Sequence, residues 1–332
     1  MPANLTPEFI AARERFQAAG TPPEKLTALE EMYAVIPKHK GTEHMRIDIK
    51  RRISKLKQQM EQERRKSGKH GYEFHIPPEG AGQVIILGPA NAGKSAILDR
   101  LTSAAPEVAE YPFTTRMPQP GMMEYEDIQI QLVDTPPVAR DYMEPWLTSI
   151  VRAGDGVLLV ADLSGDSLVE DIEGVREQLS AHKTRLVGPG TDEDPDAPFG
   201  TAYKRTLLVA NKLDLPPAPD SLGILQELYR DQFPIVAASA EAGAGIEDLR
   251  NAVYRLLDIV RVYTKVPGKP ADMNRPFTLP TGSTLMDVAR AVHRDFPDKL
   301  RFARVWGEGR PDGVMIGRDQ VVEDGDVIEL HV

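Results

Sequence analysis

The chain has 332 residues, long enough for two or three domains at roughly 150 residues each. Its 40 Lys and Arg and 50 Asp and Glu give a formal net charge of −10, and the hydrophobic fraction of 41% is that of a soluble globular protein, which excludes wholesale disorder. The absence of cysteine excludes disulfides, thiolate metal sites and cysteine nucleophiles, and it favours the cytoplasm. No apolar run approaches the roughly 20 residues that cross a bilayer, so no membrane segment is predicted.

Residues 1–75 are predicted to form a helical N-terminal region that packs as a helical hairpin. Thr6-Pro7 and Thr21-Pro22 each place a capping hydroxyl before a proline suited to the first helical position, and Thr21 with Glu24 forms a capping box. From residue 46 to residue 69 there are ten Lys or Arg and three Asp or Glu, a local charge of +7 that leaves −17 for the remainder. A third helix is predicted from apolar residues three or four apart, namely Met45, Ile49, Ile53, Leu56 and Met60.

Residues 76–262 alternate short apolar runs with helical segments. This alternation predicts an α/β domain with a mostly parallel sheet and helices on both faces. A helix over 246–262 is expected to close the domain, and the acidic stretch 188–200 is expected to be a mobile surface loop. The predicted strands are 84–87, 128–133, 157–161, 206–210 and 235–238.

The pattern changes again in residues 263–332, which contain short strands, a single helix and many turn residues. A separate α+β module is predicted there. Its helix is expected over 284–295, and its strands over 304–306, 314–316 and 327–331.

Residues 88–95, GPANAGKS, match the pattern GxxxxGK[ST] of a phosphate-binding loop between a strand and a helix. Such a loop directs backbone N–H groups at phosphate oxygens. Lys94 would reach the β- and γ-phosphates, and the Ser95 hydroxyl would bind Mg²⁺. Asp134 ends the predicted strand 128–133, where a carboxylate would hold the same ion through water.

A second motif, Asn211-Lys212-Leu213-Asp214, follows the predicted strand 206–210. The Asp214 carboxylate can accept hydrogen bonds from N1 and N2 of guanine, which adenine cannot supply. Ser239-Ala240 would place a backbone N–H near the guanine O6. These elements predict GTP and GDP as ligands, against the alternative of a P-loop kinase or ATPase that shares only the phosphate loop.

Taken in order, GPANAGKS, YPFTT, DTPP, NKLD and SAE resemble the five motifs of translation-factor-class GTPases, and YPFTT followed by PQPGMM resembles the Obg branch. The sequence from VYTKVPGKP to EDGDVIELHV is similar to the TGS domain, a ubiquitin-like β-grasp module. With the helical N-terminal region, these parts resemble the developmentally regulated GTP-binding proteins over nearly the whole chain. The resemblance implies a P-loop G domain at 76–262 and a TGS domain at 263–332.

The resemblance also implies Mg²⁺-dependent GTP hydrolysis, with Lys94 and Thr115 as catalytic residues. Thr115 would be the second protein ligand of Mg²⁺, with Thr114 as the alternative. Asn91 falls where potassium-activated GTPases coordinate a monovalent cation, but an asparagine suited to a left-handed turn fits the position equally well, so K⁺ stays open. The implied nucleotide-binding residues are Asn91, Ala92, Gly93, Lys94, Ser95, Ala96, Asn211, Lys212, Asp214, Ser239 and Ala240.

The sequence departs from the family pattern in three places, and the first two bear on mechanism. The usual DxxG glycine, whose N–H bonds the γ-phosphate, is Pro137, which has no N–H. The next residue, Val138, has no side chain that could orient water. Only 48 residues separate Asp162 from Asn211, too few for the domain that eukaryotic members insert there. From the first two departures, Pro137 above all, we expect slow intrinsic hydrolysis, with stimulation by potassium or a partner left open, and the alternative is a GTP-binding scaffold with little or no turnover.

The basic segment 46–69 contains no aromatic residue. This composition favours electrostatic docking on folded RNA over base stacking on single strands, and a solvated helix face is the alternative reading. With the TGS resemblance, the expected partner is the ribosome, tRNA or another structured RNA. A protein partner stays open.

Overall fold

The computed structural model describes residues 9, 15–16, 22–36, 45–46, 49–54, 76–102, 117–192, 194–309 and 311–331. The chain divides into two units, Met1–Glu73 and Phe74–Val332, which are described separately. None of the helices within the described ranges has the length and apolar character needed to cross a bilayer.

In the first unit, helix α2 spans Pro22–Val35, and residues 45–46 and 49–54 are also helical. Leu29, Met32 and Ile36 pack with Phe9 and Ile49 into a small apolar cluster. Ile49 belongs to the apolar stripe predicted for the third helix, so the described part of that stripe does face the cluster. Most of the basic segment lies outside the described residues.

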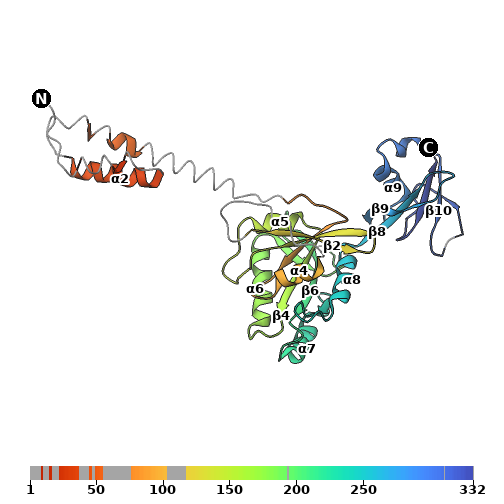
Figure 1. Cartoon of the computed structure of the whole chain (residues 1–332), viewed down its shortest axis with the longest axis horizontal. Coiled ribbons are helices and arrows are strands. Elements are labelled where there is room, and N and C mark those ends of the chain that lie inside the picture. Colours follow the sequence, from red (N-terminus) through yellow and green to blue (C-terminus); the bar gives the residue numbers. More distant parts are fainter. Residues whose placement is uncertain are drawn as a thin grey trace. The chain divides into compact units, whose positions relative to one another are not determined.

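The second unit begins with a seven-stranded sheet in the order β2-β3-β1-β4-β6-β5, in which β7 also pairs with β6 (Figure 1). Every pairing is parallel except that of β2 with β3, which confirms the predicted mostly parallel sheet. The strands are β1 (Gln83–Leu87), β2 (Gln119–Tyr125), β3 (Ile128–Asp134), β4 (Gly156–Asp162), β5 (Thr184–Val187), β6 (Ala202–Asn211) and β7 (Ile235–Ala237).

Helices cover both faces of this sheet because its central strands are mostly apolar, and β1 is buried at all five positions. In β1, Ile85 and Leu87 pack on one face with α5 (Leu147–Ala153), α6 (Leu168–Ala181) and α7 (Ala218–Tyr229). Val84 and Ile86 point to the other face and pack with α4 (Lys94–Leu101) and α8 (Ile246–Leu257). This two-sided burial is what a parallel sheet requires, and it leaves the carboxyl ends of the strands to carry the loops of the site.

A second, five-stranded sheet follows in the order β11-β10-β12-β8-β9. Helix α9 (Leu285–Val292) begins with a capping box between Thr284 and Asp287, and α10 spans Phe296–Lys299. Leu285 and Val288 of α9 pack with buried strand residues into a separate apolar core. The strands are β8 (Ile259–Lys265), β9 (Asp272–Pro280), β10 (Phe302–Trp306), β11 (Val314–Ile316) and β12 (Val327–His331).

The prediction of a helix over 246–262 is wrong beyond Leu257, where α8 ends. Asp258 takes a left-handed conformation with φ 54°, and Ile259 starts β8. Val260 and Val262 are buried in the core of the second sheet, and this tertiary burial overrides the local helical pattern. The predicted domain boundary between residues 262 and 263 therefore falls inside β8. The helix expected over 284–295 is also shorter, since it ends at Val292.

Candidate nucleotide-binding site

The loop between β1 and α4 wraps back on itself through three residues with positive φ: Gly88 (152°), Asn91 (62°) and Gly93 (90°). A Cβ at Gly88 would lie 2.5 Å from the carbonyl oxygen of Val160, so only glycine fits the close approach to β4. Within the loop Ala92 is buried, and Ala96 is exposed in the first turn of α4. The loop thus turns toward a helix N-terminus, as phosphate binding requires.

Lys94 is buried and its ammonium group donates to the carbonyl oxygens of Gly88 (3.2 Å) and Pro89 (2.7 Å). Burial lowers the pKa of Lys94, and the neighbouring Asp134 carboxylate partly opposes this effect. The ammonium group is therefore held against the loop itself, where its charge is only partly compensated.

The Ser95 hydroxyl donates to Oδ2 of Asp134 at 2.5 Å, so the two predicted Mg²⁺ ligands lie together. Burial raises the pKa of Asp134, although the hydrogen bond from Ser95 and the charge of Lys94 act in the opposite direction. The other carboxylate oxygen, Oδ1, is buried and accepts no hydrogen bond from the residues that the structure describes. A hydroxyl and an unsatisfied carboxylate oxygen suit a hard cation that prefers oxygen ligands, so these residues fit Mg²⁺.

Asn211 connects two loops of the site. Its side chain is 2% exposed; it donates to the carbonyl oxygen of Ala92 at 2.9 Å and accepts from the N–H of Ala240 at 3.1 Å. Ser239 donates to Asp214 at 2.5 Å, which leaves the rest of the exposed Asp214 carboxylate open. The structure therefore brings the phosphate loop, the NKLD motif and Ser239-Ala240 together at the carboxyl edge of the sheet.

Two parts of the chain match models of known protein families. Residues 83–189 match the family model described as "50S ribosome-binding GTPase", and residues 260–332 match the TGS domain. A developmentally regulated GTP-binding protein 2 homolog of Dictyostelium discoideum is 25% identical, over 92% of this chain and 98% of that protein. An uncharacterized GTP-binding protein of Methanocaldococcus jannaschii is 25% identical, over 98% of this chain and 97% of that protein.

The chain is a P-loop GTPase with a C-terminal TGS domain, and over more than nine-tenths of its length it is similar to developmentally regulated GTP-binding proteins. The crystal structure of a GTP-binding protein from Pyrococcus horikoshii shares its fold, with a TM-score of 0.50 and 15% identity over 75% of this chain and 99% of that one. The match to a GTPase family removes the alternative of a P-loop kinase or ATPase.

In this GTPase the DTPPV segment after β3 is firmly anchored. The hydroxyl of Thr135 donates to the carbonyl oxygen of Ile86 at 2.6 Å, and the N–H of Val138 donates to that of Gly88 at 3.1 Å. The Val138 side chain is 2% exposed and packs in the core shared with α5 and α6. Pro137 has no N–H, and the N–H of Val138 already donates to Gly88. Neither residue therefore offers a backbone donor to a γ-phosphate in this arrangement.

Sequence reasoning missed two residues that organise the guanine side of the site. Asp162 accepts from the Lys212 ammonium group at 2.6 Å, and Arg100 donates to the carbonyl oxygen of Ala240 at 3.0 Å. Burial alone would raise the pKa of Asp162, but hydrogen bonds from Lys212 and Ser164 outweigh it and lower the pKa. Asp162 ends an apolar strand at the carboxyl edge of the sheet, a signal that could have identified it.

Thr114 and Thr115, the predicted switch residues, lie outside the described residues.

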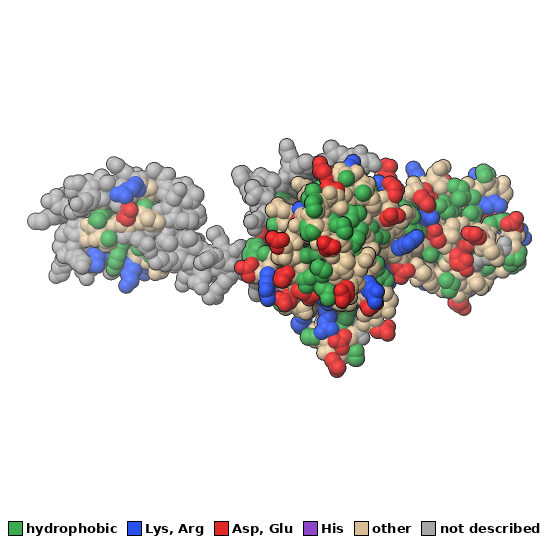
Figure 2. Space-filling view, turned by 90° about the horizontal axis from the view of Figure 1, so that it is seen from below, with side chains coloured by type: hydrophobic (Ala, Val, Ile, Leu, Met, Phe, Trp, Pro, Cys, Tyr) green, Lys and Arg blue, Asp and Glu red, His purple; other side chains and the backbone are tan. Residues whose placement is uncertain are grey.

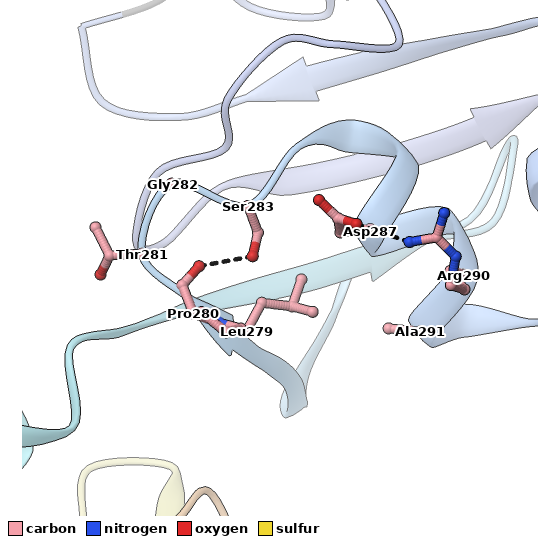
Figure 3. Close-up of a pocket in the computed structure, with 8 residues that line it drawn as sticks. All are labelled: Leu279, Pro280, Thr281, Gly282, Ser283, Asp287, Arg290 and Ala291. Carbon is pink, nitrogen blue, oxygen red and sulfur yellow. Dashed lines mark hydrogen bonds and ion pairs between the residues drawn. The ribbon is translucent and has the colours of Figure 1, made fainter. Parts of the chain in front are cut away.

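The TGS domain has a separate hollow of about 570 Å³ between the end of β9 and α9 (Figure 3). Arg290, which lines it, is already paired with Asp287 at 2.8 Å, and Ser283 donates to the carbonyl oxygen of Pro280 at 2.7 Å. Because the Asp287 carboxylate lies beside Arg290, the charges that line this hollow are of both signs, unlike those of the loop 88–95.

Proposed function

We propose that this GTPase is a GTP-operated switch with slow, Mg²⁺-dependent hydrolysis that acts on the ribosome or another structured RNA in the cytoplasm. The observation that carries the nucleotide part is the pair of hydrogen bonds by which Asn211 joins Ala92 of the phosphate loop to Ala240. A ligand that contacts both loops at once would have a phosphate chain at one end and a guanine base at the other.

In this proposal, residues of the loop 88–95 and Ala96 hold the phosphates, and Asp214 accepts from the guanine N–H groups while Lys212 lies against the base. The backbone of Ser239-Ala240 meets the guanine O6. Ser95, Asp134 and Thr115 hold Mg²⁺, which neutralises charge on the phosphates when it is bound. Lys94 exchanges its loop carbonyl partners for phosphate oxygens. Asn91 either coordinates K⁺ or serves only the turn, and its φ of 62° suits both roles.

Slow hydrolysis follows from the anchored DTPPV segment. A GTPase accelerates hydrolysis by orienting water and by bonding the γ-phosphate from this segment. Here Pro137 supplies no N–H, Val138 supplies no polar side chain, and the N–H of Val138 is bonded to Gly88. The same observation favours the second candidate, a GTP-binding scaffold with little or no turnover, and phosphate release from purified protein separates the two.

The RNA part of the proposal rests on the basic segment 46–69 and on the TGS match. Figure 2 shows acidic side chains spread among basic and hydrophobic ones on the visible face of the second unit, so that face has no extended positive surface. The segment 46–69 is therefore the better candidate for phosphate contacts. Cosedimentation with ribosomes should weaken as salt rises, and Arg64→Gln, Arg65→Gln, Lys66→Gln together should flatten that salt dependence.

The nucleotide proposal is tested by base specificity. Asp214→Asn should weaken GTP binding by about 100-fold, because two hydrogen bonds to a charged acceptor are altered at about 1.5 kcal/mol each. Binding of xanthosine triphosphate should improve in the same variant. Asp220→Asn, an exposed aspartate in the first turn of α7, is the matched control and should change neither affinity. An unchanged preference for GTP in Asp214→Asn would refute the assignment.

A further inference from the structure

A polar and aromatic cluster joins the G domain to the TGS domain, where only Asp258 separates α8 from β8. We call it the Arg261 cluster. The G domain contributes residues from the β2–β3 turn and from α8, and the TGS domain contributes residues from β8 and from the turn before β12. Its members are Glu126, Asp127, Tyr254, Arg261, Tyr263 and Asp324.

Arg261 is the centre of this cluster, with its side chain only 11% exposed. Its guanidinium group donates to Asp127 at 2.9 Å and also to Glu126, both in the G domain. A second guanidinium nitrogen donates to Asp324 of the TGS domain at 2.8 Å. The planar guanidinium group thus connects carboxylates of both domains, as a forked donor can and a lysine ammonium cannot.

Two tyrosines add contacts that cross the same boundary. Tyr254 of α8 donates to Asp324 at 3.0 Å, and Tyr263 of β8 donates to Asp127 at 2.5 Å. Burial and these carboxylate partners raise the pKa of both phenols to about 12, so both stay protonated and remain donors at neutral pH. The Tyr254 ring stacks on Tyr125 at 4.5 Å, and the guanidinium carbon of Arg261 lies 5.3 Å from its centroid.

Arg261 supplies the positive charge that holds the three carboxylates of the cluster together. One guanidinium group faces three carboxylates, two from the G domain and one from the TGS domain. Without Arg261, Asp324 would face Glu126 and Asp127 across the boundary as like charges, which repel. The connection at Asp258 is a single residue, so removal of Arg261 should free the TGS domain to turn about it.

The G-domain side of the cluster leads directly to the nucleotide site. Strand β3 begins beside Asp127 and ends at Asp134, about 23 Å further along at 3.3 Å per residue. Strand β2 pairs antiparallel with β3 without a register shift, so that Gln119 lies opposite Asp134. The turn bound by Arg261 and the proposed Mg²⁺ ligand are therefore the two ends of one β-hairpin.

We propose that the Arg261 cluster is a latch that fixes the TGS domain to the β2–β3 hairpin, so that TGS orientation and nucleotide binding influence each other. This inference rests on the proposed function, because it assumes that the nucleotide site lies at the Asp134 end of the hairpin. Linkage makes the effect reciprocal: a nucleotide that shifts the hairpin changes latch closure, and opening of the latch changes nucleotide affinity by the same factor.

The test uses spin labels in the full-length protein, which contains no cysteine. Glu177→Cys on α6 and Asp312→Cys in the TGS domain, both exposed, place one label in each domain. Distance distributions are measured with GDP and with a non-hydrolysable GTP analogue for the wild type and Arg261→Ala. The matched control is Arg304→Ala, an exposed arginine on strand β10 of the same sheet. Tyr263→Phe, a milder variant, removes only the hydroxyl donated to Asp127.

We expect a narrow distribution in the wild type and the control, a broad one in Arg261→Ala and an intermediate one in Tyr263→Phe. The ratio of GTP-analogue to GDP affinity should shift by about fivefold or more in Arg261→Ala. An Arg261→Ala distribution as narrow as that of the wild type refutes the latch, and a broad one with an unchanged affinity ratio refutes the coupling. Failure of the wild type to bind either nucleotide would instead overturn the proposed function, before any variant is compared.

Discussion

Replacement of Asn211 by alanine should destabilise the G domain even without nucleotide. The substitution removes the hydrogen bonds to Ala92 and Ala240, at 2.9 and 3.1 Å, and leaves a backbone carbonyl and a backbone N–H without their partner in a buried place. Each unsatisfied buried group costs about 1–3 kcal/mol, so the free energy of unfolding should fall by about 3 kcal/mol. At a urea slope of about 3 kcal/mol/M, the unfolding midpoint drops by about 1 M.

The measurement is urea unfolding followed by tryptophan fluorescence in a Trp306→Phe background, which leaves Trp146 as the reporter of the G domain. Asn251→Ala is the matched control, because that exposed asparagine makes one surface hydrogen bond, from Tyr125 at 3.1 Å. Its midpoint should move by less than about 0.3 M. If Asn211→Ala shifts the midpoint no more than this control does, Asn211 does not connect the loops as described.

Three further predictions concern the loops and the ion pair of the site. Gly93→Ala places a Cβ 2.2 Å from the Asn211 amide nitrogen and should abolish nucleotide binding. Gly223→Ala, where the added Cβ has no neighbour within 4 Å in α7, should instead stabilise the protein by about 0.5–1 kcal/mol in thermal unfolding. Pro137→Gly restores an N–H and should raise the ratio of GTP-analogue to GDP affinity by about tenfold in equilibrium titrations. Equal affinities for the two nucleotides would show that the anchored segment, not the missing N–H, prevents a contact with the γ-phosphate. Asp162→Asn should lower the free energy of unfolding by about 1 kcal/mol or less at pH 7. Because the pKa of Asp162 is lowered in the folded state, this loss of stability should shrink as pH falls below about 4. Urea unfolding at about pH 7, 5 and 3.5 checks this, and a loss of stability that grows with acid would contradict it.

The central strands and the phosphate loop could be predicted because their signals are local. Strand β1 is buried at all five positions, and the loop after it needs residue types at fixed spacing. Strand β2 was missed because it is an edge strand with only Met123 buried, so it shows no clear alternation. The helix that closes the G domain was predicted too long because Val260 and Val262 continue its apolar pattern but are buried in the core of the second sheet.

The organising contacts of the site were harder to predict because they join residues distant in sequence. Asn211 bonds a residue 119 positions earlier, and Arg261 bonds Asp127 from 134 positions away. The motif identifies Asn211 as a binding residue, yet only the fold shows that it also joins two loops. Nothing near Arg261 in the sequence distinguishes it from an ordinary surface arginine, since its three carboxylate partners come from two separate turns.

The central claim is that the chain is a slow GTP-hydrolysing switch, and single-turnover hydrolysis tests it most directly. Purified protein is loaded with GTP and Mg²⁺ in matched potassium and sodium buffers, with Lys94→Ala as the blank. The account predicts slow phosphate release above the blank, and faster release in potassium would support an active switch that uses Asn91. Rapid release in sodium without a partner would contradict slow hydrolysis, and no release above the blank in either buffer, with GTP binding confirmed, would contradict the switch and establish the scaffold.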